Sequence, residues 1–413
     1  MVYAAVGSLM MPGKEPQLDG LRACAVLWVI LCHGGQQVGA WGSAFVPPPP
    51  LTWDGRLHFS LGSGVSLFFL PIANGYLGVD VFFTLSGYLI GSILCDEYRR
   101  NKSISWGSFL LRRQLRIGPM LLVYVALTVR HTNCWWVDLL YIQNLNGQCY
   151  DITWSVTIEA QFYVVSVILF ALYVRVIQRW ELFSFVIKTL VLVSIAARLY
   201  MHTVVLRSEE SAGIKVLLLH SIYTQLPCRM GPYLSGMAAA IDVAYVQKAS
   251  SRCTNMLAMW CLVYVTLIGY TFVDPFRLIY SISVPVVFGL CLGHLIKEMH
   301  LGGFPLVRRM LSAACWVPIA RISYSMYLLQ FFGFRIAEFA CRRIGIRIHF
   351  GYFTSGQTIS STTSFSLLGY VVFTGIACLT TVCAAICTYI VIEYPCMKYR
   401  PHLAVRDDSR TLV

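Results

Sequence analysis

Long apolar segments alternate with short polar segments along the whole chain. Several of the apolar segments approach or exceed the roughly 18 residues that a helix needs to cross a bilayer. In lipid, a helix satisfies its own backbone hydrogen bonds, so apolar segments of this length favour helices. The sequence therefore predicts an all-α fold, a polytopic membrane helix bundle. About ten transmembrane helices are expected, at residues 20–38, 77–95, 110–129, 154–174, 184–205, 229–246, 254–272, 277–296, 318–338 and 366–392.

The composition supports a membrane protein and argues against an ordinary soluble domain. Of the 413 residues, 57% are hydrophobic and only 12% are charged, whereas soluble domains carry about a quarter charged residues. We expect one membrane domain over 1–413, with a core at about 16–398 and membrane lipids around it. The 15 cysteines lie mostly within apolar segments, and no Cys/His spacing typical of a metal site is present. The sequence predicts no metal.

The net charge of +13 comes from basic residues in short loops beside the apolar segments. This placement predicts topology, not a nucleic-acid partner, because cytoplasmic loops are enriched in Lys and Arg. With ten helices, most of the basic residues fall on one face, and both termini are then cytoplasmic. One loop, with Arg342, Arg343 and Arg347, disagrees with this placement. Cys134 and Cys149 flank a loop on the opposite face, where a disulfide is compatible with the surroundings.

The first predicted helix carries a polar stripe in the segment LDGLRACAVLWVILCH, Leu18 to His33. Asp19 and Arg22 stand near its start. His33 follows Arg22 by 11 residues, about 16 Å and about three turns, so both side chains point to nearly the same face. Intramembrane ionisable residues usually face a bundle interior or a wet cavity. Two alternatives stay open: Arg22 could extend to the cytoplasmic interface, and His33 could be a hydrogen-bonded core residue.

Two further helices carry buried acids. GYLGVDVFFTLSGYLIGSIL contains Asp80, which either caps its helix or belongs to a site, and Ser86; its glycines favour close helix packing. WSVTIEAQFYVV contains Glu159, which has no opposite charge beside it in sequence and so requires a partner from another helix. His33 is expected at a comparable depth, and a carboxylate beside it would hold the imidazole in place. The alternative is a structural tie to Arg22 or Arg198.

Arginines also start two other helices. In RRQLRIGPM, Arg113 and Arg116 are i, i+3 neighbours, and guanidinium groups are suited to binding phosphate oxygens. The alternative is an ordinary cytoplasmic flank. In TQLPCRMGPYLSG, Arg229 either anchors its helix at the interface or faces the cavity.

Six of these segments resemble, in order, motifs of the acyltransferase 3 family, integral-membrane acyltransferases that acylate carbohydrates and related acceptors. LDGLRACAVLWVILCH resembles LDGLRAxAxxxVxxxH, GYLGVDVFFTLSGYLI resembles GxxGVDxFFxLSGFLI, and RRQLRIGP resembles RRxxRIxP. WSVTIEAQFYVV resembles WSLxVExQFYLL, ISYSMYLLQ resembles ISYSxYLxH, and IEYP resembles the closing ExP. One departure concerns Gln330, which stands where the family commonly has a histidine; a glutamine cannot act as a general base.

The resemblance implies transfer of an acyl group, commonly acetyl, from cytoplasmic acyl-CoA to a hydroxyl of a carbohydrate or lipid acceptor. It implies His33 as general base or relay, oriented by Glu159, with Arg22 stabilising negative charge or binding a phosphate. Arg113 and Arg116 would hold the CoA phosphates. Weaker candidates for the site are Asp19, Asp80, Ser86 and Arg229.

Two other functions are compatible with the same residues. Ionisable groups inside a helix bundle also suit a proton-coupled transporter, although the sequence has no visible inverted repeat and its basic cluster is predicted to face the cytoplasm. A non-catalytic family member is the other alternative, because Gln330 departs from the motif.

Overall fold

The computed structural model describes residues 2–37, 71–129, 135–145, 152–207, 222–268, 276–344 and 367–398. Within these ranges the structure is helical and contains no β-strand, so the all-α prediction is confirmed there. The long helices are α2 (Pro16–Gln37), α4 (Leu77–Asn101), α5 (Trp106–Thr128), α7 (Trp154–Leu172), α8 (Trp180–Arg207), α10 (Leu226–Ile241), α11 (Arg252–Ile268), α12 (Phe276–His300), α14 (Trp316–Arg343) and α15 (Leu367–Thr388). Shorter helices are α1 (Val2–Leu9), α6 (Trp135–Leu139), α13 (Pro305–Leu311) and α16 (Tyr394–Lys398), and π-helical turns extend α7, α10 and α15.

Each of the ten predicted ranges overlaps one of these long helices. Six helical segments in the described part of the chain are long and apolar enough to cross a membrane: Pro16–Gln37, Pro71–Asn101, Trp154–Ile177, Trp180–Val204, Ile282–His300 and Leu367–Lys398. Membrane crossing by the other four helices stays a prediction, as does the cytoplasmic placement of the termini. Arg347, Cys134 and Cys149 lie outside the described residues.

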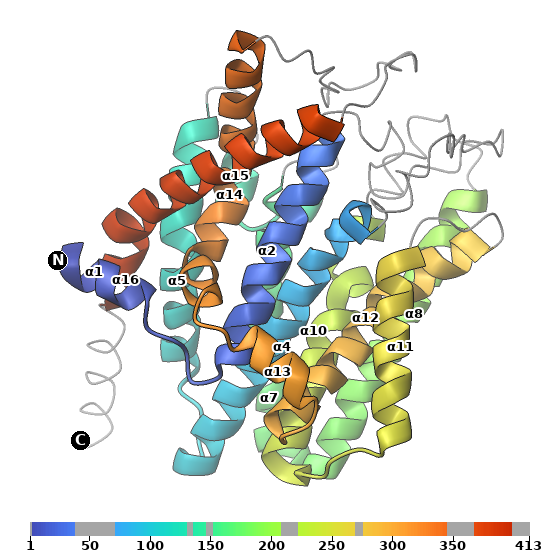
Figure 1. The fold of residues 1–413 in the computed structure, drawn as a ribbon. Helices are drawn as coiled ribbons and strands as arrows, with labels where there is room; N and C mark the ends of the chain where they lie inside the picture. The colour runs from blue at the N-terminus through green and yellow to red at the C-terminus, as the bar shows by residue number, and fades with distance from the viewer. Residues whose placement is uncertain are drawn as a thin grey trace.

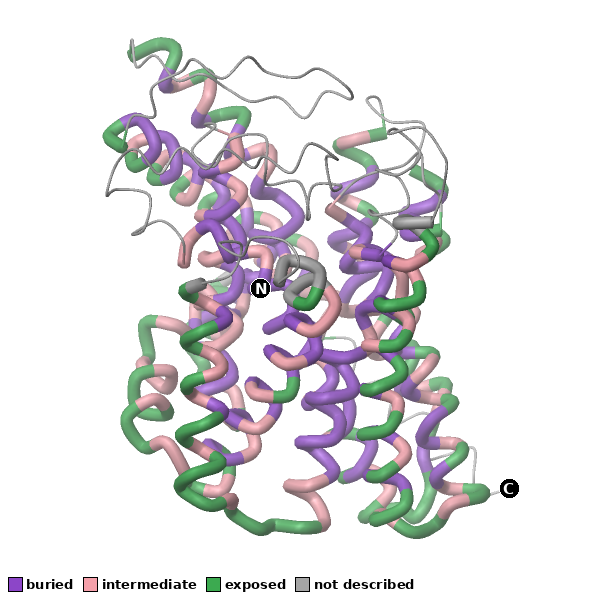
Figure 2. Tube along the Cα trace, turned by 90° about the vertical axis from the view of Figure 1, so that its right-hand side faces the viewer, coloured by how far each residue is buried: buried purple, intermediate pink, exposed green. Residues whose placement is uncertain are grey.

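Helix α2 lies between two groups of helices (Figure 1). On one side it packs against α4, which contacts α10 and α12; α10 in turn contacts α8. On the other side it packs against α14, which contacts α15 and α5. Buried residues gather in the interior of the bundle and exposed residues on its outside (Figure 2). Many exposed side chains are large and apolar, among them Leu192, Trp260 and Val391, as expected of a surface that faces lipid.

Glycines allow the backbones of α4 and α10 to touch. A Cβ atom at Gly87 would lie 1.9 Å from the carbonyl oxygen of Tyr233, and one at Gly236 would lie 2.0 Å from the carbonyl oxygen of Thr84. Such close approach is typical of small residues at membrane helix interfaces. The contact places the Tyr233 ring in a stack with Phe83, with the ring centroids 4.5 Å apart.

The N-terminal half of α14 is tied to the end of α15 and its π-helical turn through hydroxyl groups. Ser325 donates a hydrogen bond to the carboxylate of Glu393, and Thr388 donates to Ser325 Oγ over 3.2 Å. At the preceding residue, the Tyr324 hydroxyl donates to the carbonyl oxygen of Ile117 on α5 over 2.9 Å. These bonds set the rotation of α14, and therefore the direction of the side chains that it presents to α2.

We predict that Gly87→Val destabilises the protein, because the new side chain would meet a backbone carbonyl that cannot move independently of α10. Overpacking typically costs about 1–3 kcal/mol. Thermal unfolding in detergent, followed by size-exclusion chromatography, should show a lower transition temperature. Gly375→Val on α15 is the matched control, because a Cβ there has no atom within 4 Å. An equal shift in both variants, or none in Gly87→Val, would contradict this account of the α4–α10 contact.

Candidate active site

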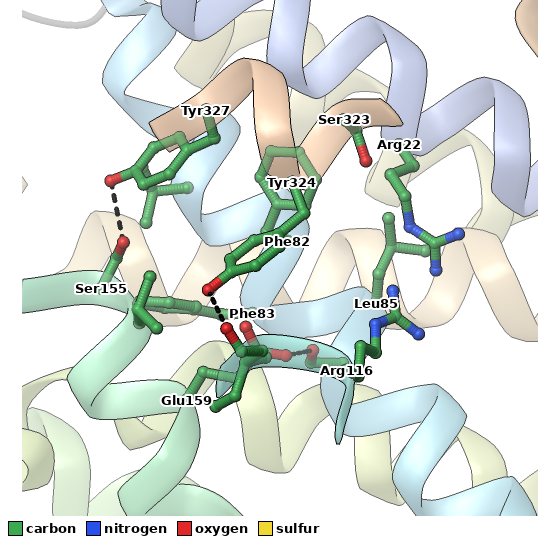
Figure 3. A pocket seen from close by; sticks show the side chains of 14 residues that line it. Arg22, Phe82, Phe83, Leu85, Arg116, Ser155, Glu159, Ser323, Tyr324 and Tyr327 are labelled. Carbon is green, nitrogen blue, oxygen red and sulfur yellow. Dashed lines mark hydrogen bonds between the residues drawn. The ribbon is translucent and has the colours of Figure 1, made fainter. Parts of the chain in front are cut away.

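A small polar pocket of about 70 Å³ lies where five helices meet: α2, α4, α5, α7 and α14 (Figure 3). Apolar residues such as Phe82, Phe83 and Leu85 form part of its wall. The polar side chains that line it are Arg22, Ser86, Arg116, Ser155, Glu159, Ser323, Tyr324 and Tyr327. Pockets that combine an apolar wall with a few convergent polar groups are the usual form of a small-molecule site.

Glu159 is held in the pocket by two hydroxyl groups. Its Oε1 atom accepts a hydrogen bond from Ser86 Oγ over 2.6 Å and another from the Tyr163 hydroxyl, also over 2.6 Å. Ser86 belongs to α4, whereas Glu159 and Tyr163 are one turn apart on α7. The sequence predicted that Glu159 needs a partner from another helix. That partner is the Ser86 hydroxyl, which binds the carboxylate together with the Tyr163 hydroxyl and without an ion pair.

The pocket carries two guanidinium groups close together, opposite Ser155 and Tyr327 (Figure 3). Arg22 forms an ion pair with Asp19, with 3.5 Å between Nη1 and Oδ1. Asp19 also accepts a hydrogen bond from the backbone N–H of Gly13 over 2.8 Å, so its role is to hold the start of α2 and Arg22. Arg116 has no carboxylate within 4.0 Å among the described residues. Arg22 is paired with Asp19, so Arg116 is the guanidinium of the lining that is available to an anionic ligand.

The predicted contact between Glu159 and His33 is not found. His33 Nδ1 lies 2.8 Å from Gln330 Oε1, and the described hydrogen bonds of Glu159 go to Ser86 and Tyr163. His33 is also not among the residues that line the pocket. A comparable depth in the membrane does not bring two side chains together when their helices face different neighbours.

Arg22 and His33 were predicted to lie on nearly the same face of the first helix, and they do. Arg22 shares the pocket with Ser323 and Tyr324 of α14, and His33 contacts Gln330 of the same helix. Both side chains therefore lie on the face of α2 that meets α14.

The two arginines predicted to act as a pair are separated by the structure. Arg116 lines the pocket, but the Arg113 guanidinium stacks on the rings of Phe109 and Tyr163, at 5.4 and 5.9 Å from their centroids. Arg113 does not line the pocket. Residues three apart on a helix differ by about 60° in direction, which here is enough to turn one toward the cavity and the other toward an aromatic cluster.

Asp80 and Arg229 form a buried ion pair away from the pocket. Asp80 Oδ1 lies 3.3 Å from Arg229 Nη1, and the side chains are 0% and 1% exposed. The Arg229 guanidinium also stacks on Tyr223, at 4.4 Å from the ring centroid, and on Trp154, at 5.2 Å. The pair joins α4 to α10. Asp80 lies within α4, whose N-cap residue is Tyr76, so the helix-cap interpretation is not supported. Neither Asp80 nor Arg229 lines the pocket.

Sequence reasoning did not single out the tyrosines of the pocket. Ser155 Oγ donates to the Tyr327 hydroxyl over 2.8 Å, and Tyr324 lies one turn from Tyr327 in the same wall. The signal was present in ISYSMYLLQ, where hydroxyl side chains recur at the i, i+1 and i+4 spacing of one helix face. In the described ranges, no group of three His, Cys, Asp or Glu residues could hold a metal ion.

The chain is similar both to a known family and to single known proteins. A family model described as an acyltransferase domain matches residues 15–390. The peptidoglycan O-acetyltransferase OatA of Listeria monocytogenes serovar 1/2a is 32% identical over 132 residues, which are 32% of this chain and 16% of that protein. The O-acetyltransferase OatA of Staphylococcus aureus is 28% identical over 178 residues, 37% of this chain and 24% of that protein.

These matches span less than a third of the length of the curated relatives. No solved structure matches the chain. The six apolar helices and the membrane family together make this an integral, multi-pass membrane protein. Because the family model covers nearly the whole chain, from residue 15 to residue 390, the chain belongs to the acyltransferase 3 family.

Proposed function

We propose that the protein is a membrane-bound O-acyltransferase. It moves an acyl group, by preference acetyl, from cytoplasmic acyl-CoA to a hydroxyl of a carbohydrate or lipid acceptor. Family membership supports the reaction class, and the names of the relatives support acetyl as the acyl group. One relative is named for peptidoglycan, which favours a carbohydrate among the two acceptor classes. The observation that carries the proposal is the placement of Arg22 and His33 on one face of α2, with Arg22 in the pocket that Arg116 also lines.

The pocket supports a role in binding the donor. Arg22 and Arg116 offer planar forks of N–H donors, which match the geometry of phosphate oxygens. Glu159, hydrogen-bonded to Ser86 and Tyr163, lines the same pocket as the two arginines. Of the two arginines predicted to hold CoA phosphates, Arg116 is the better placed, because Arg113 stacks on aromatic rings.

His33 would act on the acceptor, about 16 Å along α2 from Arg22. In this reaction, the acceptor hydroxyl gives its proton to the imidazole while its oxygen attacks the thioester carbonyl carbon. The carbon–sulfur bond then breaks, and the CoA thiolate leaves and takes up the proton. Direct transfer of this kind needs no additional nucleophile. An elongated donor is required, because its phosphates would lie near the arginines while its thioester reaches the histidine.

We predict that His33→Ala reduces acyl transfer about 10²- to 10⁴-fold, because a general base contributes roughly that factor. Membranes with matched amounts of protein would be incubated with radiolabelled acetyl-CoA and assayed for label in glycan and lipid fractions. His300→Ala is the control, because His300 lies at the end of α12, 40% exposed, and does not line the pocket. Equal labelling by wild type and His33→Ala would rule out His33 as the base.

We predict that Arg116→Ala raises the KM for acyl-CoA about 10- to 100-fold, since a hydrogen bond to a charged group contributes about 1.5–3 kcal/mol. Steady-state kinetics at several acetyl-CoA concentrations would measure this change, and Arg116→Lys should recover part of it. Arg112→Ala is the control: Arg112 is on the same helix but pairs with Glu97 at 3.6 Å. An unchanged KM in Arg116→Ala, or an equal rise in Arg112→Ala, would place the donor elsewhere.

A further inference from the structure

We propose that Gln330 is a positioning residue that fixes the tautomer of His33, with the proton on Nδ1 and the lone pair on Nε2. This inference rests on the proposed function of His33 as the base. It gives a role to the position at which the chain departs from the family motif. A base must present a nitrogen without a proton to the acceptor hydroxyl, and the two ring nitrogens of a neutral histidine differ in this respect.

The orientation of the Gln330 amide follows from its second partner. The side chain is fully buried, at 0% exposure, and its Nε2 atom lies 2.8 Å from the backbone carbonyl oxygen of Tyr327. A carbonyl oxygen can only accept, so the amide group that faces it must be the NH₂. The amide oxygen Oε1 is therefore the atom that faces His33 Nδ1 at 2.8 Å.

The tautomer of His33 follows from that orientation. An amide oxygen has no proton to give, so the hydrogen bond requires that Nδ1 carries the proton. A neutral imidazole has one N–H, and Nε2 is then left with its lone pair. Nε2 of His33 has no hydrogen-bond partner among the described residues, as a nitrogen that receives a substrate proton requires.

The elements around Gln330 hold it in place. The Tyr327 hydroxyl donates to the carbonyl oxygen of Ile152 over 3.0 Å and accepts from Ser155 over 2.8 Å, which anchors the turn of α14 that presents the Tyr327 carbonyl. The imidazole ring also packs against Phe331, with the ring centroids 5.7 Å apart. The wall of the donor pocket and the orientation of the base therefore depend on the same turn of α14.

Gln330 is neutral, and two titratable side chains on or against the same part of α2 donate to backbone carbonyl oxygens. Cys32 on α2 donates to the carbonyl oxygen of Ala73 over 3.2 Å, and Tyr370 on α15 donates to the carbonyl oxygen of Leu31 over 3.1 Å. In the described ranges no carboxylate lies within 4.0 Å of His33. A glutamine can therefore select the tautomer without adding charge that would hold a proton on the ring.

The first experiment reads the tautomer directly. Protein labelled with ¹⁵N at histidine would be placed in lipid nanodiscs at a pH where the ring is neutral, and His33→Ala would identify the His33 signals among the nine histidines. The expected result is a protonated Nδ1 and an unprotonated Nε2. A proton on Nε2 in the wild-type protein would overturn the proposal whatever the activity assay shows.

The second experiment measures two substitutions kinetically. Gln330→Leu removes the acceptor, and we expect kcat to fall about 10- to 100-fold, the usual effect of losing an orienting partner, with the KM for acetyl-CoA unchanged. Gln330→Glu keeps an acceptor for Nδ1 and adds a charge that stabilises the imidazolium. It should retain the tautomer and most of the activity at high pH, with the acid limb of the pH–rate profile moved to higher pH.

Gln17→Leu is the matched control, because Gln17 is a buried glutamine at the start of α2, the helix that carries His33, and it bonds to Glu15. Unchanged kcat in Gln330→Leu, or a pH–rate profile in Gln330→Glu identical to that of wild type, would overturn the proposal. Gln330→Glu and the spectrum of the wild-type protein decide the question even if Gln330→Leu fails to fold. The proposed function fails separately, if His33→Ala keeps full transfer activity.

Discussion

The cost of burying a polar side chain in an apolar bundle governs how these helices fit together. A buried charge without a partner is expensive, so each helix that carries one must be turned until a partner is in reach. Asp80 on α4 finds Arg229 on α10 at 3.3 Å, and Glu159 on α7 finds the Ser86 hydroxyl on α4 at 2.6 Å. These contacts supply the directional information that apolar packing lacks, because lipid chains compete equally well for apolar surfaces.

Helix α2 links the two halves of the bundle and carries the groups that matter most for the proposed chemistry. One face of α2 packs against α4 and another packs against α14. Arg22 and His33 lie on the face toward α14. A single helix therefore holds the arginine proposed to bind the donor and the histidine proposed as the base at a constant separation. Substitutions that tilt α2 or α14 should affect the proposed donor binding and the proposed base together. Substitutions in α8 or α11 lie farther from Arg22 and His33.

The partner of His33 stands at a position where the chain departs from the family motif. A base inside a low-dielectric bundle needs an orienting group, but a charged one would also stabilise its protonated form. Gln330 supplies only the orientation, because its amide is neutral and is itself held by the Tyr327 carbonyl. A glutamine cannot act as a base, but its presence at this position is compatible with His33 as the base.

From the sequence alone, the helical bundle, the ranges of its helices, the polar stripe on α2 and the family motifs could be predicted. These are local properties, set by the length and periodicity of apolar segments. Only the tertiary structure decided the partners: Glu159 bonds to Ser86 and not to His33, Gln330 bonds to His33, and Arg113 stacks on aromatic rings while its neighbour enters the pocket. Such contacts depend on the rotation and crossing of helices distant in sequence, and no pattern within one helix encodes them.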